Sequence, residues 1–206
     1  PKAFKISTQA PIGKTRKLLY EEAASFLSDV LNAVRSRKTF TVEKGFEVVR
    51  RIVGVNHPQD PVLVMSLHHD NWRQYVIHHP VNVSIFAIKM ADHLGFSKEK
   101  QVEIGMAGLL HDVGMAVVPD KILYNQGKLN NEEYKLFKQR PNFSSKILRT
   151  LGDKHVYLAE CAVQFYERID GSGYPRGLQA SEMHEYAQLI GLLDMYESLI
   201  HSRPQR

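Results

Sequence analysis

Apolar residues recur at three- and four-residue steps along most of this 206-residue chain, and that spacing constrains the fold more than any other sequence feature. Between residues 18 and 34, for example, it places Leu19, Phe26, Val30 and Val34 on one face of an amphipathic helix. No stretch alternates apolar and polar residues between hairpin turns, which is the pattern of β-strands. We therefore predict an all-α fold of about eight helices, packed as a bundle.

Prolines, glycines and capping residues divide this pattern into segments. We predict a leader or linker over residues 1–16, an N-terminal helical segment over 17–70, and a larger helical domain over 71–206 that is truncated at its C-terminal end. Ordered helix is expected to begin near Arg16. Further helices are expected from about 42 to 55 and over 81–94, 98–112, 130–137, 144–151, 155–169 and 181–201, with Ser97 and Asn130 as caps and a kink or break at Pro141. The helix over 98–112 is apolar on nearly every side from Ile104 to Leu110, so we expect it to be central and buried.

The charge and cysteine content disfavour several classes of protein. The formal net charge is +5, and its excess lies in the N-terminal third without interleaved aromatic residues, which disfavours DNA or RNA as a partner. No apolar run approaches the length of a membrane span, so we expect no membrane contact by this segment. The single cysteine, Cys161, cannot form an internal disulfide, and a cytoplasmic protein is expected.

Histidine and aspartate residues are the candidates for metal binding. Two His-Asp pairs occur, and we interpret His69-Asp70, in a polar stretch, as solvated. His111-Asp112, in contrast, ends an apolar helix, where burial is costly unless the two side chains are paired or bind a metal. Gly114 allows the chain to turn sharply after this pair.

Two further residues could complete a metal site. His79 stands at the head of one apolar helix, and Asp194 interrupts the apolar run from Leu189 to Met195. Two histidines and two aspartates without sulfur form a nitrogen and oxygen site, which suits Mn, Fe, Co, Ni or Mg better than structural zinc. A buried ion pair is the alternative explanation of these residues.

A series of motifs then matches a known family from about residue 72 to the end of the chain. It comprises the His79 helix start with Asn82 and Val83, Leu109-Leu110-His111-Asp112-Val113-Gly114, Val118 to Leu123, Gly127-Lys128-Leu129, Glu167 to Pro175, Gly177-Leu178, Asp194-Met195-Tyr196 and Arg203-Pro204. In this order the chain resembles the HD-GYP branch of the HD phosphohydrolase superfamily. The resemblance implies a bacterial helical bundle that binds two or three metal ions, usually iron or manganese, and hydrolyses cyclic di-GMP in signal transduction.

Carried over residue by residue, the resemblance assigns His79, His111, Asp112 and Asp194 to one metal ion. Asp112 would be the catalytic carboxylate that bridges to a second ion. The family's further metal-ligating histidines are replaced here by Arg140, Phe165 and Tyr166, and a phosphate-contacting lysine is replaced by Met115. Arg203 and Arg206 match basic residues that hold phosphates in the family.

These replacements lead to two functional hypotheses. The first is a degenerate regulator that keeps one divalent ion, Mn or Fe, and binds a cyclic dinucleotide, another nucleotide or a protein partner without turnover, with Arg140 contacting phosphate. The second is an active one-metal phosphohydrolase. Repacking without functional meaning would also explain Arg140, Phe165 and Tyr166.

Two interaction surfaces are also expected. The resemblance implies that Gly173, Tyr174 and Pro175 contact a diguanylate cyclase domain, and a plain turn with Tyr174 packed down is the alternative. The amphipathic helices from Arg16 to Val53 could pair with a second copy of the chain, although packing onto the bundle also accounts for their apolar faces.

Overall fold

The structure, a computed structural model, describes residues 10–56, 72–125 and 127–200. Its helices are α1 (Ala10–Arg35), α2 (Glu43–Val55), α3 (Trp72–His93), α4 (Lys98–Leu110), α5 (Asp120–Leu123), α6 (Asn131–Phe137), α7 (Arg140–Leu148), α8 (Val156–Gln164) and α9 (Glu185–Ile200), with four short 3-10 turns between them. Within these residues there is no strand, only an isolated antiparallel bridge between Asp170 and Gln179. The prediction of an all-α fold is confirmed.

The predicted helix caps are present. The Ser97 hydroxyl accepts a hydrogen bond from the amide of Lys100, 3.3 Å away, at the start of α4. Asn130 and Glu133 form a capping box at the start of α6, each side chain accepting from the other residue's backbone amide. Because these bonds satisfy amides that have no partner within the helix, they fix where both helices begin.

Several helix boundaries differ from the sequence prediction. The helix α1 begins at Ala10, within the predicted leader, and α3 begins at Trp72 and continues through Pro80. Pro141 is the second residue of α7, so it starts a helix rather than breaking one, which agrees with the tolerance of the first helical turn for proline. At the C-terminal side α8 ends at Gln164, and α9 begins only at Glu185.

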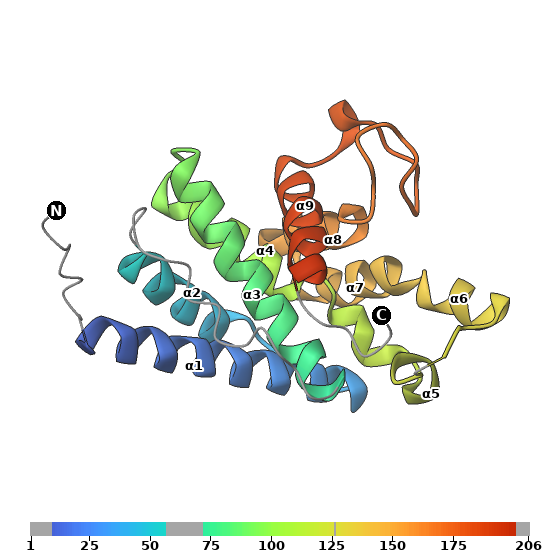
Figure 1. The fold of residues 1–206 in the computed structure, drawn as a ribbon, viewed down its shortest axis with the longest axis horizontal. Helices are drawn as coiled ribbons and strands as arrows, with labels where there is room; N and C mark the ends of the chain where they lie inside the picture. Colours follow the sequence, from blue (N-terminus) through green and yellow to red (C-terminus); the bar gives the residue numbers. More distant parts are fainter. Residues whose placement is uncertain (1–9, 57–71, 126, 201–206) are drawn as a thin grey trace, which may run out of the picture.

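The core is organised around α4, as predicted. Figure 1 shows α1 and α2 side by side on one flank, α3 crossing them, and α8 and α9 on the opposite side. Ile104, Met106, Leu109 and Leu110 of α4 are almost completely buried, and they join the helices of both flanks in one apolar cluster. Each such side chain stabilises the fold by about 1.5–3 kcal/mol relative to an exposed position. The end of α4, which carries His111 and Asp112, is therefore held firmly in the interior.

Gly114 allows the turn after α4 to pack directly against the start of α7. A methyl group at this position would overlap the carbonyl oxygen of Arg140 and would lie 2.8 Å from the amide nitrogen of Ser144. The Gly114 amide also donates a 2.8 Å hydrogen bond to the Ser144 hydroxyl. This close approach brings Arg140 beside Asp112.

We therefore expect Gly114→Ala to destabilise the fold by about 1–3 kcal/mol, because backbone atoms cannot move aside as a flexible side chain can. Urea denaturation would measure the change. Gly54→Ala is the control, since a methyl group there meets no atom within 4 Å. Equal stability of the two variants would contradict the assigned role of Gly114.

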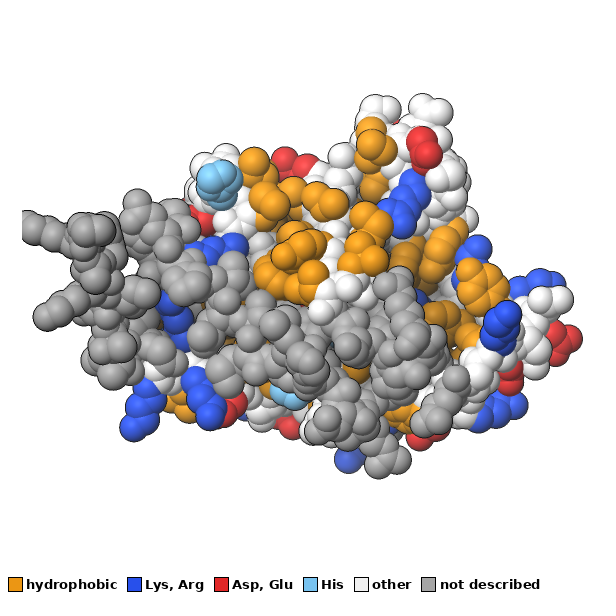
Figure 2. Space-filling model, viewed as in Figure 1, with side chains coloured by type: hydrophobic (Ala, Val, Ile, Leu, Met, Phe, Trp, Pro, Cys, Tyr) orange, Lys and Arg blue, Asp and Glu red, His pale blue; other side chains and the backbone are white. Residues whose placement is uncertain are grey.

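The apolar surface is concentrated on α9. None of the described helices has a stretch long and apolar enough to cross a bilayer. Figure 2 shows apolar side chains gathered where α3 and α9 lie in Figure 1. The large apolar side chains of α9 that are exposed are Leu192, Met195, Tyr196, Leu199 and Ile200.

Candidate metal centre

Three helical elements bring the candidate metal ligands together in the interior. His79 comes from the middle of α3, His111 follows the last residue of α4, and Asp194 comes from α9. One nitrogen of each histidine and one Asp194 oxygen all lie within 4.8 Å of one another. His79 Nε2 is 2.9 Å from Asp194 Oδ1, and His111 Nε2 is 3.5 Å from the same oxygen. The structure thus brings together three of the four residues predicted to bind one ion.

The remaining ring nitrogens fix how both histidines face this point. His111 Nδ1 lies 2.7 Å from the carbonyl oxygen of Gly108, so Nδ1 carries a proton and Nε2 is the ring nitrogen that faces Asp194. His79 Nδ1 hydrogen bonds to the carboxylate of Glu197, which is fully buried one helical turn beyond Asp194. A carboxylate or carbonyl behind each imidazole is the usual arrangement at histidines that bind metal.

Glu197 is itself held in a buried polar network. Its second oxygen accepts a 2.9 Å hydrogen bond from the Asn82 side chain, and the Asn82 oxygen accepts one of 2.9 Å from the Tyr20 hydroxyl. Tyr20 lies on α1, so the N-terminal helix supports the site through this chain of hydrogen bonds. Sequence reasoning did not identify Glu197 or Tyr20 as part of the site. The i, i+3 spacing of Asp194 and Glu197 in an apolar helix was the available signal.

Two buried carboxylates dominate the electrostatics around His79. Burial alone would lower the pKa of His79, but hydrogen bonds and charge interactions with Asp194 and Glu197 raise it to about 9. Burial would likewise raise the pKa of Asp194, yet the two histidines hold it well below its usual range. Without a cation, the site therefore depends on a positive charge on His79 to balance its carboxylates.

Two buried polar atoms provide the direct test of whether these residues fit a metal ion. His111 Nε2 and Asp112 Oδ1 are buried and form no hydrogen bond with any residue that the structure describes. Leaving such atoms without a partner is costly, and metal coordination is one way to satisfy both a histidine nitrogen and a carboxylate oxygen. The donor set therefore fits a divalent ion that prefers nitrogen and oxygen ligands.

The other oxygen of Asp112 is committed to a different partner. Asp112 Oδ2 accepts a 2.6 Å hydrogen bond from Nη1 of Arg140, and only 5% of the Arg140 surface is exposed. Burial raises the pKa of Asp112, against the attraction of this guanidinium. The role of Asp112 as a metal ligand and catalytic residue stays a prediction.

Nearly every donor of Arg140 is occupied. Besides Asp112, the guanidinium contacts the Phe137 carbonyl oxygen at 3.1 Å, the Met115 sulfur at 3.1 Å and the Tyr166 hydroxyl at 2.5 Å. Its central carbon also lies 3.9 Å from the centre of the Phe137 ring. A phosphate contact by Arg140 stays a prediction, and in this arrangement it would have to displace one of these partners.

Aromatic side chains occupy the positions of the other two missing histidines. The Phe165 ring packs edge-on against His111, with centroids 4.7 Å apart, and Tyr166 stacks on Tyr174 at 4.9 Å. Tyr174 is half-buried, and the ammonium group of Lys138 lies 4.4 Å from its ring centre. Much of the Tyr174 side chain is therefore in contact with neighbouring residues of the same chain.

The loop that carries Tyr174 is anchored by the buried carboxylate of Glu167. Its oxygens accept backbone hydrogen bonds from Arg176 at 2.6 Å and Leu178 at 3.1 Å. A methyl group on Gly173 would overlap the backbone of Glu167 and Arg168, so only glycine permits this close approach. Arg203, Arg206, His69 and Asp70 lie outside the described residues.

Comparisons with known proteins agree with this fold and site. The sequence pattern described as the HD domain matches residues 62–206. A 3'3'-cGAMP-specific phosphodiesterase of Vibrio cholerae is 32% identical over 75% of this chain and 36% of that protein. Cyclic di-GMP phosphodiesterases of Pseudomonas aeruginosa and Thermotoga maritima are 32% and 33% identical over 65% and 62% of this chain, and 32% and 35% of those proteins.

A solved structure shares the fold. An HDG"Y"P protein from Bdellovibrio bacteriovorus superimposes with a TM-score of 0.73 at 20% sequence identity, covering 96% of this chain and 64% of that one. The chain belongs to the HD domain family, and the resemblance to its HD-GYP branch is confirmed. It spans about a third of the length of the curated relatives it matches.

Proposed function

We propose that this domain binds one divalent cation, Mn or Fe, and receives a cyclic dinucleotide or another nucleotide beside it as a signalling input, without hydrolysing it. His79, His111 and Asp194 would hold the cation, with Asp112 as a fourth ligand through its unbonded oxygen. When bound, such an ion polarises phosphoryl oxygens and lowers the pKa of bound water. The names of the relatives support the class of ligand.

The observation that carries the proposal is the ion pair between Arg140 and Asp112. Hydrolysis by two metal ions requires both the attacking and the leaving oxygen to be stabilised by cations. Here the guanidinium already neutralises one oxygen of Asp112, the predicted bridging carboxylate. Burial raises the pKa of Tyr166 far above its usual value, so its phenol stays neutral and is a poor metal ligand. These residues support binding of one cation rather than two.

The test combines binding and product analysis. Calorimetric titration with cyclic di-GMP in the presence of Mn is expected to show binding, while chromatography of the same mixture after long incubation is expected to show no linear product. Metal-dependent product that disappears in the Asp112→Ala variant would overturn the regulator and support the phosphohydrolase alternative. Absence of any binding to cyclic di-GMP and to mononucleotides would overturn nucleotide recognition.

The predicted partner surface at Gly173, Tyr174 and Pro175 belongs to the same proposal. Tyr174→Ala is expected to weaken capture of a diguanylate cyclase domain by at least about tenfold, because an aromatic anchor on a rigid loop contributes strongly to binding. Because the ring also stacks on Tyr166, a modest fall in melting temperature is expected as well. Leu94→Ala, at an exposed apolar residue far from this loop in the sequence, is the control. A large loss of stability in Tyr174→Ala would instead assign this ring to packing.

Pairing of two copies through the N-terminal helices stays a prediction. Most apolar side chains of α1 face the core, including Leu19, Phe26 and Leu27. Among the described residues of α1 and α2, Leu18 is the large apolar side chain that is mostly exposed. Much of the apolar surface of α1 and α2, which suggested a dimer, is therefore already buried against the bundle.

A further inference from the structure

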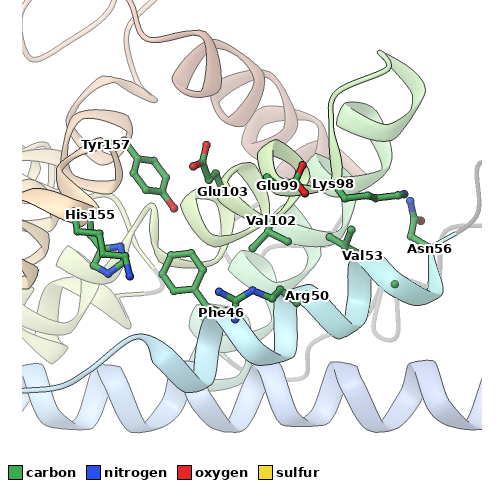
Figure 3. A pocket seen from close by; sticks show the side chains of 12 residues that line it. Phe46, Arg50, Val53, Asn56, Lys98, Glu99, Val102, Glu103, His155 and Tyr157 are labelled. Atoms are coloured by element: carbon green, nitrogen blue, oxygen red, sulfur yellow. The ribbon is translucent and has the colours of Figure 1, made fainter.

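A second cavity lies away from the metal centre, between the N-terminal helices and the larger helical domain. Its volume is about 710 Å³, and its walls come from α2, the first turns of α4 and the residues that lead into α8 (Figure 3). Small-molecule sites in proteins commonly have volumes of about 300–1,000 Å³. None of the candidate metal ligands lines this cavity.

One end of the cavity is aromatic. Figure 3 shows Phe46, His155 and Tyr157 grouped there, with Val53 and Val102 toward the other end. The rings of Phe46 and His155 are 5.1 Å apart and tilted by 31°. Rings and valine side chains around one space suit a flat, largely apolar ligand body.

Two cationic side chains at this cavity have no carboxylate partner among the described residues. In the described part of the chain, neither Arg50 nor Lys154 forms an ion pair, and the Arg50 guanidinium lies 5.7 Å from the centre of the Phe46 ring. Of the other charged lining groups, Glu99 is an exposed carboxylate that interacts with its own backbone and with Ser97, whereas Lys98 and Glu103 have partners on other helices or loops. Lys98 pairs with Asp92 at 3.0 Å, and the Glu103 carboxylate accepts a 2.8 Å hydrogen bond from the Tyr186 hydroxyl.

The Tyr157 hydroxyl is a second, independent indication that the cavity can take a polar ligand. Its oxygen is buried and forms no hydrogen bond with any described residue. In Figure 3 the hydroxyl points from the aromatic end toward the middle of the cavity. A buried hydroxyl without a partner costs free energy, which a polar group on a ligand would recover.

We propose that this cavity binds a small aromatic anion, with its ring against Phe46 and Tyr157 and its carboxylate or phosphate between Arg50 and Lys154. The site is separate from the metal centre and does not depend on the function proposed for it. Because its lining comes from both α2 and the helices α4 and α8, a ligand would contact the N-terminal helices and the larger domain at once. The cavity is thus an input site for a small-molecule effector.

The test uses calorimetric titration of the full chain in the presence of EDTA, so that the metal centre is empty. Indole-3-acetate and GMP are the two probes, and they distinguish an aromatic carboxylate from a nucleotide phosphate. At least one is expected to bind, and its neutral counterpart, indole-3-acetamide or guanosine, is expected to bind at least about tenfold more weakly. The variant Arg50→Gln/Lys154→Gln should also lose about tenfold in affinity, whereas Lys135→Gln/Lys146→Gln, at exposed lysines outside the cavity, should match the wild type.

Gly54 offers a way to block the cavity without disturbing the fold. It lines the cavity, and a Cβ atom added there meets no atom within 4 Å. Gly54→Phe is expected to abolish probe binding while its melting temperature stays near the wild-type value, and Gly54→Ala is expected to keep binding. Binding of neither probe at millimolar concentration, or undiminished binding by Gly54→Phe, would overturn the site.

Discussion

Asp194→Asn is expected to remove the bound metal ion almost completely. The wild-type chain should carry about one equivalent of Mn or Fe, and the variant less than about a tenth of that. The reason is that the amide keeps the shape of Asp194 but removes the negative charge that faces both His79 and His111. Mass-spectrometric metal analysis after anaerobic purification and gel filtration measures the difference, and circular dichroism shows whether the variant is folded.

Two further substitutions on α9 separate direct ligation from support. Glu197→Gln should weaken metal binding by about 10–100-fold, because the carboxylate that orients His79 is replaced by a neutral amide. Glu185→Gln, at an exposed glutamate on the same helix, should leave metal content unchanged. Full metal content in a folded Asp194→Asn protein would show that the three residues do not form the metal centre.

Sequence periodicity predicted helices well where one face of a helix is buried. α1 and α2 have such faces, and the prediction missed only their ends. It failed for the first turns of α3, where Val76 and His79 are buried but helix was expected only from Val81. Val81, Val83 and Ala87 are all buried, so this helix lacks the single apolar face that gives an amphipathic helix its three- and four-residue spacing.

The metal centre was predictable because burial makes unpaired charges costly. Asp194 and His111 are polar residues in apolar helices, which is why the sequence predicts them as metal ligands. The structure places them together. The sequence could not indicate that Arg140 would turn toward Asp112, since that contact depends on how α7 packs against the turn at Gly114. Tertiary packing of this kind has no local signature along the chain.

That contact is also the basis of the last prediction. Arg140→Met is expected to destabilise the fold by about 3–5 kcal/mol, because it leaves the buried Asp112 carboxylate without its counter-charge. Urea denaturation in EDTA measures this loss without any contribution from metal. Arg149→Met is the matched control, since Arg149 pairs with Glu160 in an exposed position, and its loss should cost about 0–1 kcal/mol.

A second substitution distinguishes loss of the charge pair from loss of packing. Adding Asp112→Asn to Arg140→Met removes the unpaired charge, so we expect the double variant to regain about half of the lost stability. A packing defect alone would be unchanged or worsened by the second substitution. If Arg140→Met costs no more than Arg149→Met, then the guanidinium does not neutralise Asp112. In that case, the carboxylate is free to bridge two cations, and the regulator proposed above loses its main support.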